Sequence, residues 1–113
     1  MASPVLIAAL HHRLQRVNEL ESNGEWQAAF IVLEEAHVLS QRLTRWHCRV
    51  HWRMGRNGWA RRDWREVLGQ ITRFPAAALF SRIWVPSGNS GGARTSALKP
   101  MPIPAELQTY LDS

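Results

Sequence analysis

The sequence predicts an all-α protein built from two antiparallel helical hairpins. Apolar residues recur at helical spacing through most of the first 84 residues, and three short turns, two of which contain glycine, divide this region into four segments. A weak repeat also relates residues 24–29 to residues 62–67, since each has an acid, a tryptophan and a polar residue before a helix. The offset of about 38 residues is close to the tetratricopeptide period, so the four helices form either tetratricopeptide-like hairpins or an ordinary bundle.

The first hairpin is defined by clear start and stop signals. A helix is expected from Pro4 to about Ser22, with Ser3 as its N-cap and proline in the first turn. Gly24 follows in the position that favours a helix C-terminus. A second helix is expected from about Glu25, fraying at residues 41–43.

The second hairpin begins at Thr44, which we interpret as the N-cap of a helix ending near Asn57 and Gly58. Asp63 then caps a fourth helix, with Glu66 completing a capping box. Pro75 predicts a kink or a break, with helix continuing beyond it towards residue 84.

The chain changes character at Val85, so we divide it into a helical domain (1–84) and an irregular tail (85–113). Residues 86–92 are rich in Gly, Ser and Pro, which favours turns. Residues 99–104 alternate proline with other residues and should be extended. A short last helix is expected between Pro104 and Leu111. Because the tail carries Met, Ile and Leu, we expect it to pack on the helical domain.

Composition restricts the classes of function. The 113 residues carry a formal charge of +5, which favours an acidic partner. Cys48 is the single cysteine, so an internal disulfide and a multi-cysteine zinc site are excluded. The apolar N-terminus lacks a preceding basic region and no apolar run is long enough for a membrane span, so we expect a cytoplasmic protein.

Four strings of residues resemble one bacterial family. They are Ala36–Gln41, Arg49–Met54, Arg61–Gln70 and Pro100–Pro104, and together they span most of the chain after residue 25. The chain resembles the small-protein family "domain of unknown function 3703". The resemblance implies a small, helical, cytoplasmic bacterial protein, and it implies no activity.

Three histidines form the first candidate site. His37 lies on the apolar stripe of the second helix, and His47 and His51 lie one turn apart on that of the third. An antiparallel hairpin that closes near residues 42–43 brings all three into one layer, where they could hold a transition-metal ion. Glu34 with His37 forms a Glu-x-x-His pattern and is a fourth candidate ligand. The alternative is that these histidines are core residues hydrogen-bonded within the protein.

A stripe of arginine and tryptophan on the outer face of the third helix forms the second candidate site. Arginine and tryptophan are the residues that most often anchor protein interfaces. They also suit contact with phosphates and bases, although no sequence-specific nucleic-acid-binding motif is present. The candidate partner-binding residues are Arg45, Arg49, Trp52, Arg53, Arg56, Trp59, Arg61 and Arg62.

These features favour a non-enzymatic interaction or accessory module that binds a protein partner, or a second copy of itself, through the Arg/Trp face. The first alternative is a metal- or cofactor-binding protein that uses the histidine layer. The second is non-specific nucleic-acid binding through the basic face. No phosphate-binding glycine loop and no nucleophile motif occurs, so we assign no catalytic residue.

Overall fold

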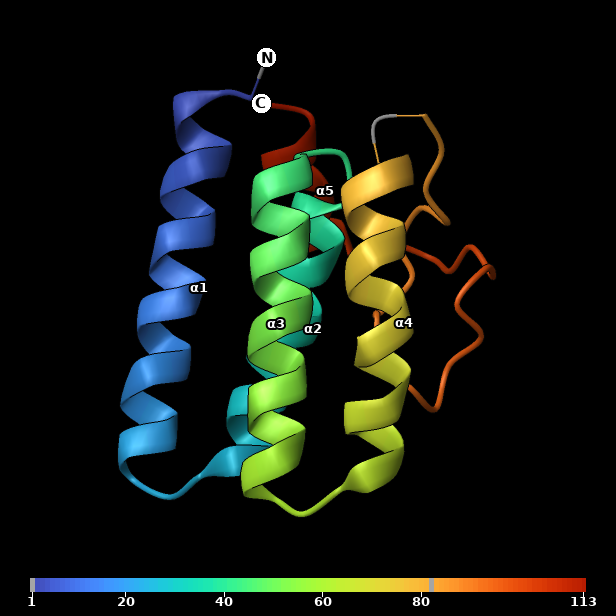
Figure 1. Cartoon of the computed structure of the whole chain (residues 1–113). Helices are drawn as coiled ribbons and strands as arrows, with labels where there is room; N and C mark the ends of the chain where they lie inside the picture. The colour runs from blue at the N-terminus through green and yellow to red at the C-terminus, as the bar shows by residue number, and fades with distance from the viewer. Residues whose placement is uncertain (1, 82) are drawn as a thin grey trace.

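Five helices make up the fold in the computed structural model, which describes residues 2–81 and 83–113 (Figure 1). The helices are α1 (Pro4–Ser22), α2 (Trp26–Ser40), α3 (Thr44–Ala60), α4 (Trp64–Phe80) and α5 (Ala105–Leu111). The described residues contain no strand, and none of their helices is both long and apolar enough to cross a membrane. The prediction of an all-α protein is therefore confirmed.

Local capping explains most of the helix boundaries. The Ser3 hydroxyl accepts a hydrogen bond from the Leu6 backbone N–H, and the Asp63 carboxylate accepts one from the Glu66 N–H. The predicted capping box is only half formed, because the Glu66 carboxylate accepts hydrogen bonds from Gln70 and Ala93 instead.

The third helix differs from its prediction at both ends. Leu43, and not Thr44, is its N-cap, and the helix continues past Asn57 and Gly58 to Ala60. Asn57 and Gly58 are both buried inside the helix. A Cβ at position 58 would lie only 3.0 Å from that of Glu66, so the absence of a side chain lets α3 approach α4 closely.

Helix α2 lies at the centre of the arrangement. It packs against α1, α3 and α5, and the three long helices α1, α2 and α3 supply nearly all of the hydrophobic core. Helix α4 packs against α3 and contacts no other helix among the described residues. These pairs are consistent with two hairpins, α1/α2 and α3/α4, while the choice between a tetratricopeptide-like array and a bundle stays a prediction.

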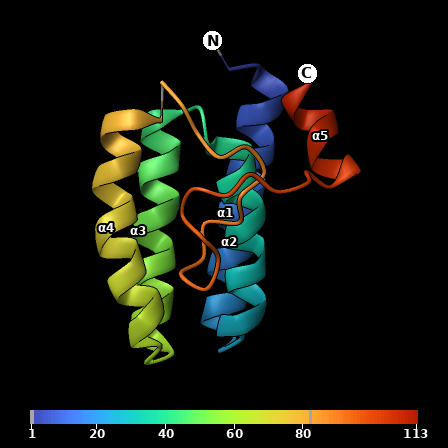
Figure 2. The same cartoon turned by 90° about the vertical axis from the view of Figure 1, so that its right-hand side faces the viewer.

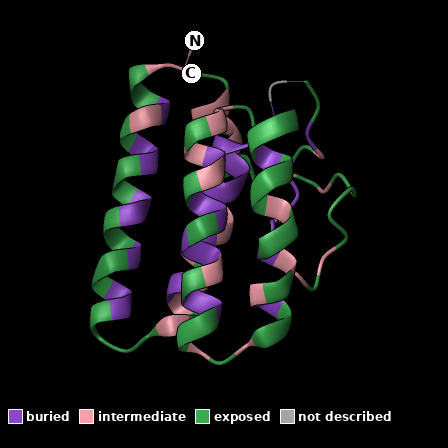
Figure 3. Cartoon of the chain, in the orientation of Figure 1, coloured by how far each residue is buried: buried purple, intermediate pink, exposed green. Residues whose placement is uncertain are grey.

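Helix α4 turns its polar side inward. Its buried residues are Glu66, Gln70 and Ala77, whereas Leu68 and Ile71 are 66% and 61% exposed. Figure 3 shows α4 as the most exposed of the four long helices. Pro75 does not break the helix, which continues to Phe80. The apolar stripe of α4 therefore faces outward over much of its length.

The loop after α4 lies between α2 and α4, which do not contact each other (Figure 2). Gly88 donates its backbone N–H to the side chain of Gln41, the C-cap of α2, and the Gly91 carbonyl accepts from Gln70 and Arg73 on α4. Asn89 is 2% exposed and organises the loop, because its amide donates to two loop carbonyls. The boundary between two domains at residue 85 stays a prediction.

A buried polar network joins α1 to α3, and it corrects one prediction. Arg53 was expected on the exposed outer face, yet it is only 8% exposed and its guanidinium donates to Asn18 and Glu21. Asn57 also donates to the Glu21 carboxylate, at 3.0 Å. Glu21 thus accepts from two buried side chains of α3.

Replacing Glu21 with alanine is expected to destabilise the protein strongly. Arg53 would keep its buried charge and Asn57 its buried amide without their shared acceptor, a loss of about 3–5 kcal/mol in the free energy of unfolding. Urea denaturation followed by circular dichroism measures this value.

Glu19→Ala on the same helix is the matched control, since within the described part of the chain the Glu19 carboxylate pairs with the exposed Arg16 alone. It should cost less than about 1 kcal/mol. Equal losses in the two variants would contradict the importance of the buried network.

Candidate metal centre

The structure brings the three predicted histidines together in the interior between α2 and α3. Their Nε2 atoms form a triangle with sides of 3.1 Å (His37–His47), 3.0 Å (His47–His51) and 3.2 Å (His37–His51). All three side chains are buried. The i, i+4 spacing places His47 and His51 on one face of α3, and the short turn after α2 brings His37 opposite them.

The rings point toward a common centre through their Nε2 atoms. Ring centroids are 4.7–4.9 Å apart, well beyond the 3.0–3.2 Å that separates the nitrogens. The three imidazoles therefore converge tip to tip and do not stack face to face.

This triangle has the size that a metal ion requires. An ion that binds imidazole nitrogens at about 2.05 Å separates them by about 3.3 Å at the tetrahedral angle and by about 2.9 Å at a right angle. The three measured separations lie between these limits. Among the described residues, no other His, Cys, Asp or Glu offers an atom to the same point. A ligand from solvent or from a bound molecule would complete the coordination.

The outer nitrogen of His37 is held by the loop after α4. Its Nδ1 lies 2.7 Å from the backbone carbonyl of Asn89. A carbonyl can only accept, so this nitrogen carries the proton and the Nε2 lone pair points into the triangle. Gly91, at φ +84°, lets the loop approach the ring, since a Cβ there would lie 2.6 Å from the ring carbon Cδ2.

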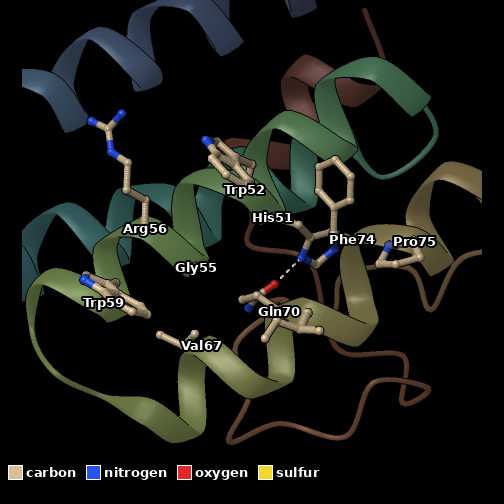
Figure 4. A pocket seen from close by; sticks show the side chains of 10 residues that line it. His51, Trp52, Gly55, Arg56, Trp59, Val67, Gln70, Phe74 and Pro75 are labelled. Carbon is tan, nitrogen blue, oxygen red and sulfur yellow. Dashed lines mark hydrogen bonds between the residues drawn. The ribbon is translucent and has the colours of Figure 1, made fainter.

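The outer nitrogen of His51 is held by α4. Its Nδ1 lies 2.5 Å from Oε1 of Gln70, as the dashed line in Figure 4 shows. The Gln70 amide nitrogen donates to a Glu66 oxygen at 2.7 Å and to the Gly91 carbonyl at 2.8 Å, which orients its oxygen toward the ring. His51 therefore also carries its proton on Nδ1 and directs its Nε2 lone pair inward.

His47 has no such support. Among the described residues, its buried Nδ1 has no hydrogen-bond partner of acceptable geometry, although the nearby backbone carbonyl of Gln41 raises its pKa against the larger lowering effect of burial. With protons on the outer nitrogens of His37 and His51, only His47 can place a proton inside the triangle. One hydrogen cannot bridge all three pairs of nitrogens, so lone pairs face each other without a donor.

Burial keeps the imidazoles neutral. It lowers the pKa of His47 from 6.5 to about 4 and that of His51 to about 3, with the charge of His47 adding to the effect on His51. Burial, followed by the neighbouring His51 and His47, also lowers the pKa of His37 well below 6.5. All three rings are thus in the form that binds metal at neutral pH.

A cavity of about 200 Å³ adjoins the triangle, and all three histidines line it. Its other walls come from α4 and the following loop, including Arg73, Ala77, Phe80, Trp84 and Val85. A metal ion in the triangle would therefore have one side accessible to a small molecule.

Glu34, the fourth predicted ligand, does not join the histidines. Its carboxylate is not among the groups that meet at the triangle, and the residue lines a separate pocket with Arg61, Glu66 and Arg94. One turn before His37 on α2, its side chain emerges on the loop side of the helix, where burial raises its pKa and Ser90 hydrogen-bonds to it. The assignment of Glu34 as a ligand is wrong.

Only part of the predicted Arg/Trp face is exposed to solvent. Trp52 and Trp59 are 63% and 64% exposed, and they line an apolar groove of about 480 Å³ between α3 and α4 (Figure 4). The exposed members of the predicted set are Arg45, Arg49, Trp52, Arg56, Trp59 and Arg62. Arg53 is buried, as described above. Arg61 is half-buried, donating to Asn57 and Asp63 and lying over the Phe30 ring.

Sequence reasoning missed the groups that support the histidines. Asn89 and Gly91 lie in a loop for which the sequence predicts only turns. Gln70 lies on the fourth helix, whose prediction rests on its apolar residues alone. The one available signal for Gln70 was its position one turn after Glu66, which puts two polar residues on the same side of the helix.

The comparison with protein families agrees with the resemblance noted in the sequence. A family model described as "Protein of unknown function (DUF3703)" matches residues 5–111, nearly the whole chain. The chain belongs to this family. No curated protein and no solved structure matches it.

The low pKa values of this DUF3703 protein predict a pH-dependent stability. As pH falls below about 6.5, the unfolded chain takes up protons on these histidines while the folded protein does not. Each such histidine lowers the free energy of unfolding by up to about 1.4 kcal/mol per pH unit, and the loss ends once pH passes the folded pKa values, about 4 for His47 and about 3 for His51.

Urea denaturation of the metal-free protein between pH 7 and pH 4 measures this slope. His47→Leu should reduce it by the contribution of one proton, whereas His12→Gln, at an exposed position on α1, should leave it nearly unchanged. An identical slope in the wild type and in His47→Leu would contradict the assignment.

Proposed function

We propose that this protein binds one divalent transition-metal ion through Nε2 of His37, His47 and His51. The observation that carries the proposal is the triangle of buried nitrogens 3.0–3.2 Å apart, with lone pairs directed to one point. Imidazole nitrogens suit Zn²⁺, Cu²⁺, Fe²⁺ and Ni²⁺, and Zn²⁺ accepts three such ligands with a fourth from outside the protein.

The supporting hydrogen bonds strengthen this interpretation over that of a polar core. Histidines that ligate metals usually donate their other nitrogen to a carbonyl or carboxylate, as His37 and His51 donate to Asn89 and Gln70. A polar core that was satisfied without metal would place donors opposite acceptors inside the triangle. In this structure at least two acceptors, the Nε2 atoms of His37 and His51, face each other inside the triangle.

Zinc is expected to bind the untagged protein at one ion per chain and to stabilise it. At a free Zn²⁺ concentration 100 times the dissociation constant, the free energy of unfolding should rise by about 2.7 kcal/mol. Because the histidines are neutral at pH 7, binding should release almost no protons from them. Calorimetric titrations in two buffers of different ionisation enthalpy measure affinity, stoichiometry and proton release together.

His47→Leu is the informative variant, because His47 lacks a partner for its outer nitrogen and its loss leaves the other hydrogen bonds intact. Zinc affinity should fall at least about 100-fold, while the metal-free variant stays within about 1 kcal/mol of wild-type stability. His12→Gln serves as the control for zinc binding at surface histidines. If Zn²⁺, Cu²⁺, Ni²⁺ and Fe²⁺ all leave the wild type unaffected, the proposal is wrong.

The groove between α3 and α4 supports a second function, that of a protein-interaction module. Its lining includes Trp52, Trp59, Ile71 and Phe74, all of which are exposed, and exposed apolar side chains that cluster in this way often mark an interaction site. Arg56 lies at its edge, and both acids of the α3/α4 hairpin are engaged, Asp63 with Arg94 and Glu66 with Gln70.

This charge pattern favours an acidic amphipathic helix as the occupant. A second copy of the chain would oppose arginine to arginine, whereas an acidic helix would pair with them. The cytoplasm stays the predicted location for both functions.

A synthetic 18-residue helix with leucine on one face and glutamate on the other tests the groove. Fluorescence anisotropy should show binding that weakens at least tenfold in Trp52→Ala and that is absent for the same peptide with lysine in place of glutamate. Val5→Ala, which removes an exposed apolar side chain on α1, is the control.

Two other results would contradict an acidic-helix site. Sedimentation that shows a dimer lost in Trp52→Ala would assign the groove to a second copy. Binding of generic DNA or RNA at about 50 mM salt, lost in Arg56→Ala, would assign the face to nucleic acid.

A further inference from the structure

The cavity beside the three histidines has a chemistry of its own. It is mostly apolar, with walls from Ala77, Phe80, Trp84, Val85 and Leu98, and it opens between α4 and the loop that follows. Among the described residues, the charged side chain that lines it is that of Arg73, one turn after Gln70 on α4. The cavity thus combines the three metal-binding nitrogens, a guanidinium and an apolar wall.

No acid among the described residues neutralises a metal ion at this place. Three neutral imidazoles leave a divalent ion with its full charge, and Arg73 adds another positive charge nearby. Glu66 lies outside the cavity, where it accepts hydrogen bonds from Gln70 and from the Ala93 backbone and offsets part of the charge of Arg73, and Glu34 lines a different pocket, so the charge of the ion itself is not offset. The charge of the loaded site therefore favours an anion as the next ligand.

Arg73 is positioned to bind such an anion. One terminal nitrogen donates to the Gly91 carbonyl at 3.1 Å and the other to the Thr95 carbonyl at 2.7 Å. These bonds use two of the five guanidinium N–H groups and fix the side chain against the loop. Burial lowers the pKa of its guanidinium, against the opposing effect of the Glu66 charge, and a carboxylate partner would offset the effect of burial further.

We propose that the cavity binds a small monocarboxylate, which coordinates the metal ion held by His37, His47 and His51 and pairs with Arg73. This inference rests on the proposed metal-binding function. A volume of about 200 Å³ is below the roughly 300–1,000 Å³ of pockets for drug-sized ligands, so the acid has only a few carbon atoms. Its alkyl chain lies against Phe80 and Val85.

Replacing zinc with cobalt(II) allows carboxylate binding to be measured, since the visible absorption of Co²⁺ depends on its coordination. Titration with acetate, propionate and butyrate should change the spectrum of the Co²⁺ protein saturably. Affinity should rise about fourfold for each added CH₂, because each methylene is buried against the apolar wall. Benzoate, which is bulkier, should bind more weakly than butyrate.

Arg73→Met tests the guanidinium, with Arg65→Met on the exposed face of α4 as the matched control. The Arg73 variant should keep stoichiometric Co²⁺ binding and lose at least tenfold in butyrate affinity, and the Arg65 variant should match the wild type. The chain-length series on the wild type tests the cavity independently if Arg73→Met does not fold.

The outcomes separate the two proposals. A Co²⁺ spectrum that does not respond to about 100 mM butyrate, or that responds equally in wild type and Arg73→Met, overturns the carboxylate site and leaves metal binding in place. If the wild type shows no Co²⁺ absorption and none of Zn²⁺, Cu²⁺, Ni²⁺ and Fe²⁺ affects it, the metal site and the carboxylate site are overturned together.

Discussion

The convergence of three buried imidazoles is the constraint on which the C-terminal half of the structure depends. A buried ring needs a partner for its outer nitrogen, and the partners of His37 and His51 both come from outside α2 and α3. The loop after α4 supplies the Asn89 carbonyl, and α4 supplies Gln70. Helix α4 therefore presents a polar side to the interior, and the loop fills the gap between α4 and α2 with hydrogen-bonded backbone in place of apolar side chains.

The outward apolar surface of α4 follows from the same constraint. An amphipathic helix that turns Glu66 and Gln70 inward must expose the residues on its other side, including Leu68 and Ile71. Where this surface meets Trp52 and Trp59 of α3 it forms the groove, and the His51–Gln70 pair lies at its floor (Figure 4). His51 thus lines both the groove and the cavity, so the two candidate functions share one side chain.

Helix positions and the meeting of the histidines could be predicted from the sequence because both depend on local geometry. Caps and turns define the helices, and a short turn between two helices brings residues at equal distances from it together. The prediction that Arg53 lies on the outer face of the third helix is wrong for a geometric reason. Residues four apart are rotated by about 40° around the helix axis, so Arg53 lies about 80° from Arg45, toward the core. The roles of Gln70 and Asn89 depend on contacts across the fold, which local patterns do not contain.

The unequal support of the three rings also argues against a purely structural role. If these three side chains served only to fill the core, leucine would stabilise the protein more than histidine, since a buried polar group without a partner costs about 1–3 kcal/mol. The fold instead holds two rings by their outer nitrogens, keeps all three neutral at pH 7 by burial, and leaves the inner nitrogens facing each other. A cation at their centre pairs every inner lone pair at once. The geometry that is unfavourable without an ion is therefore the geometry that an ion requires.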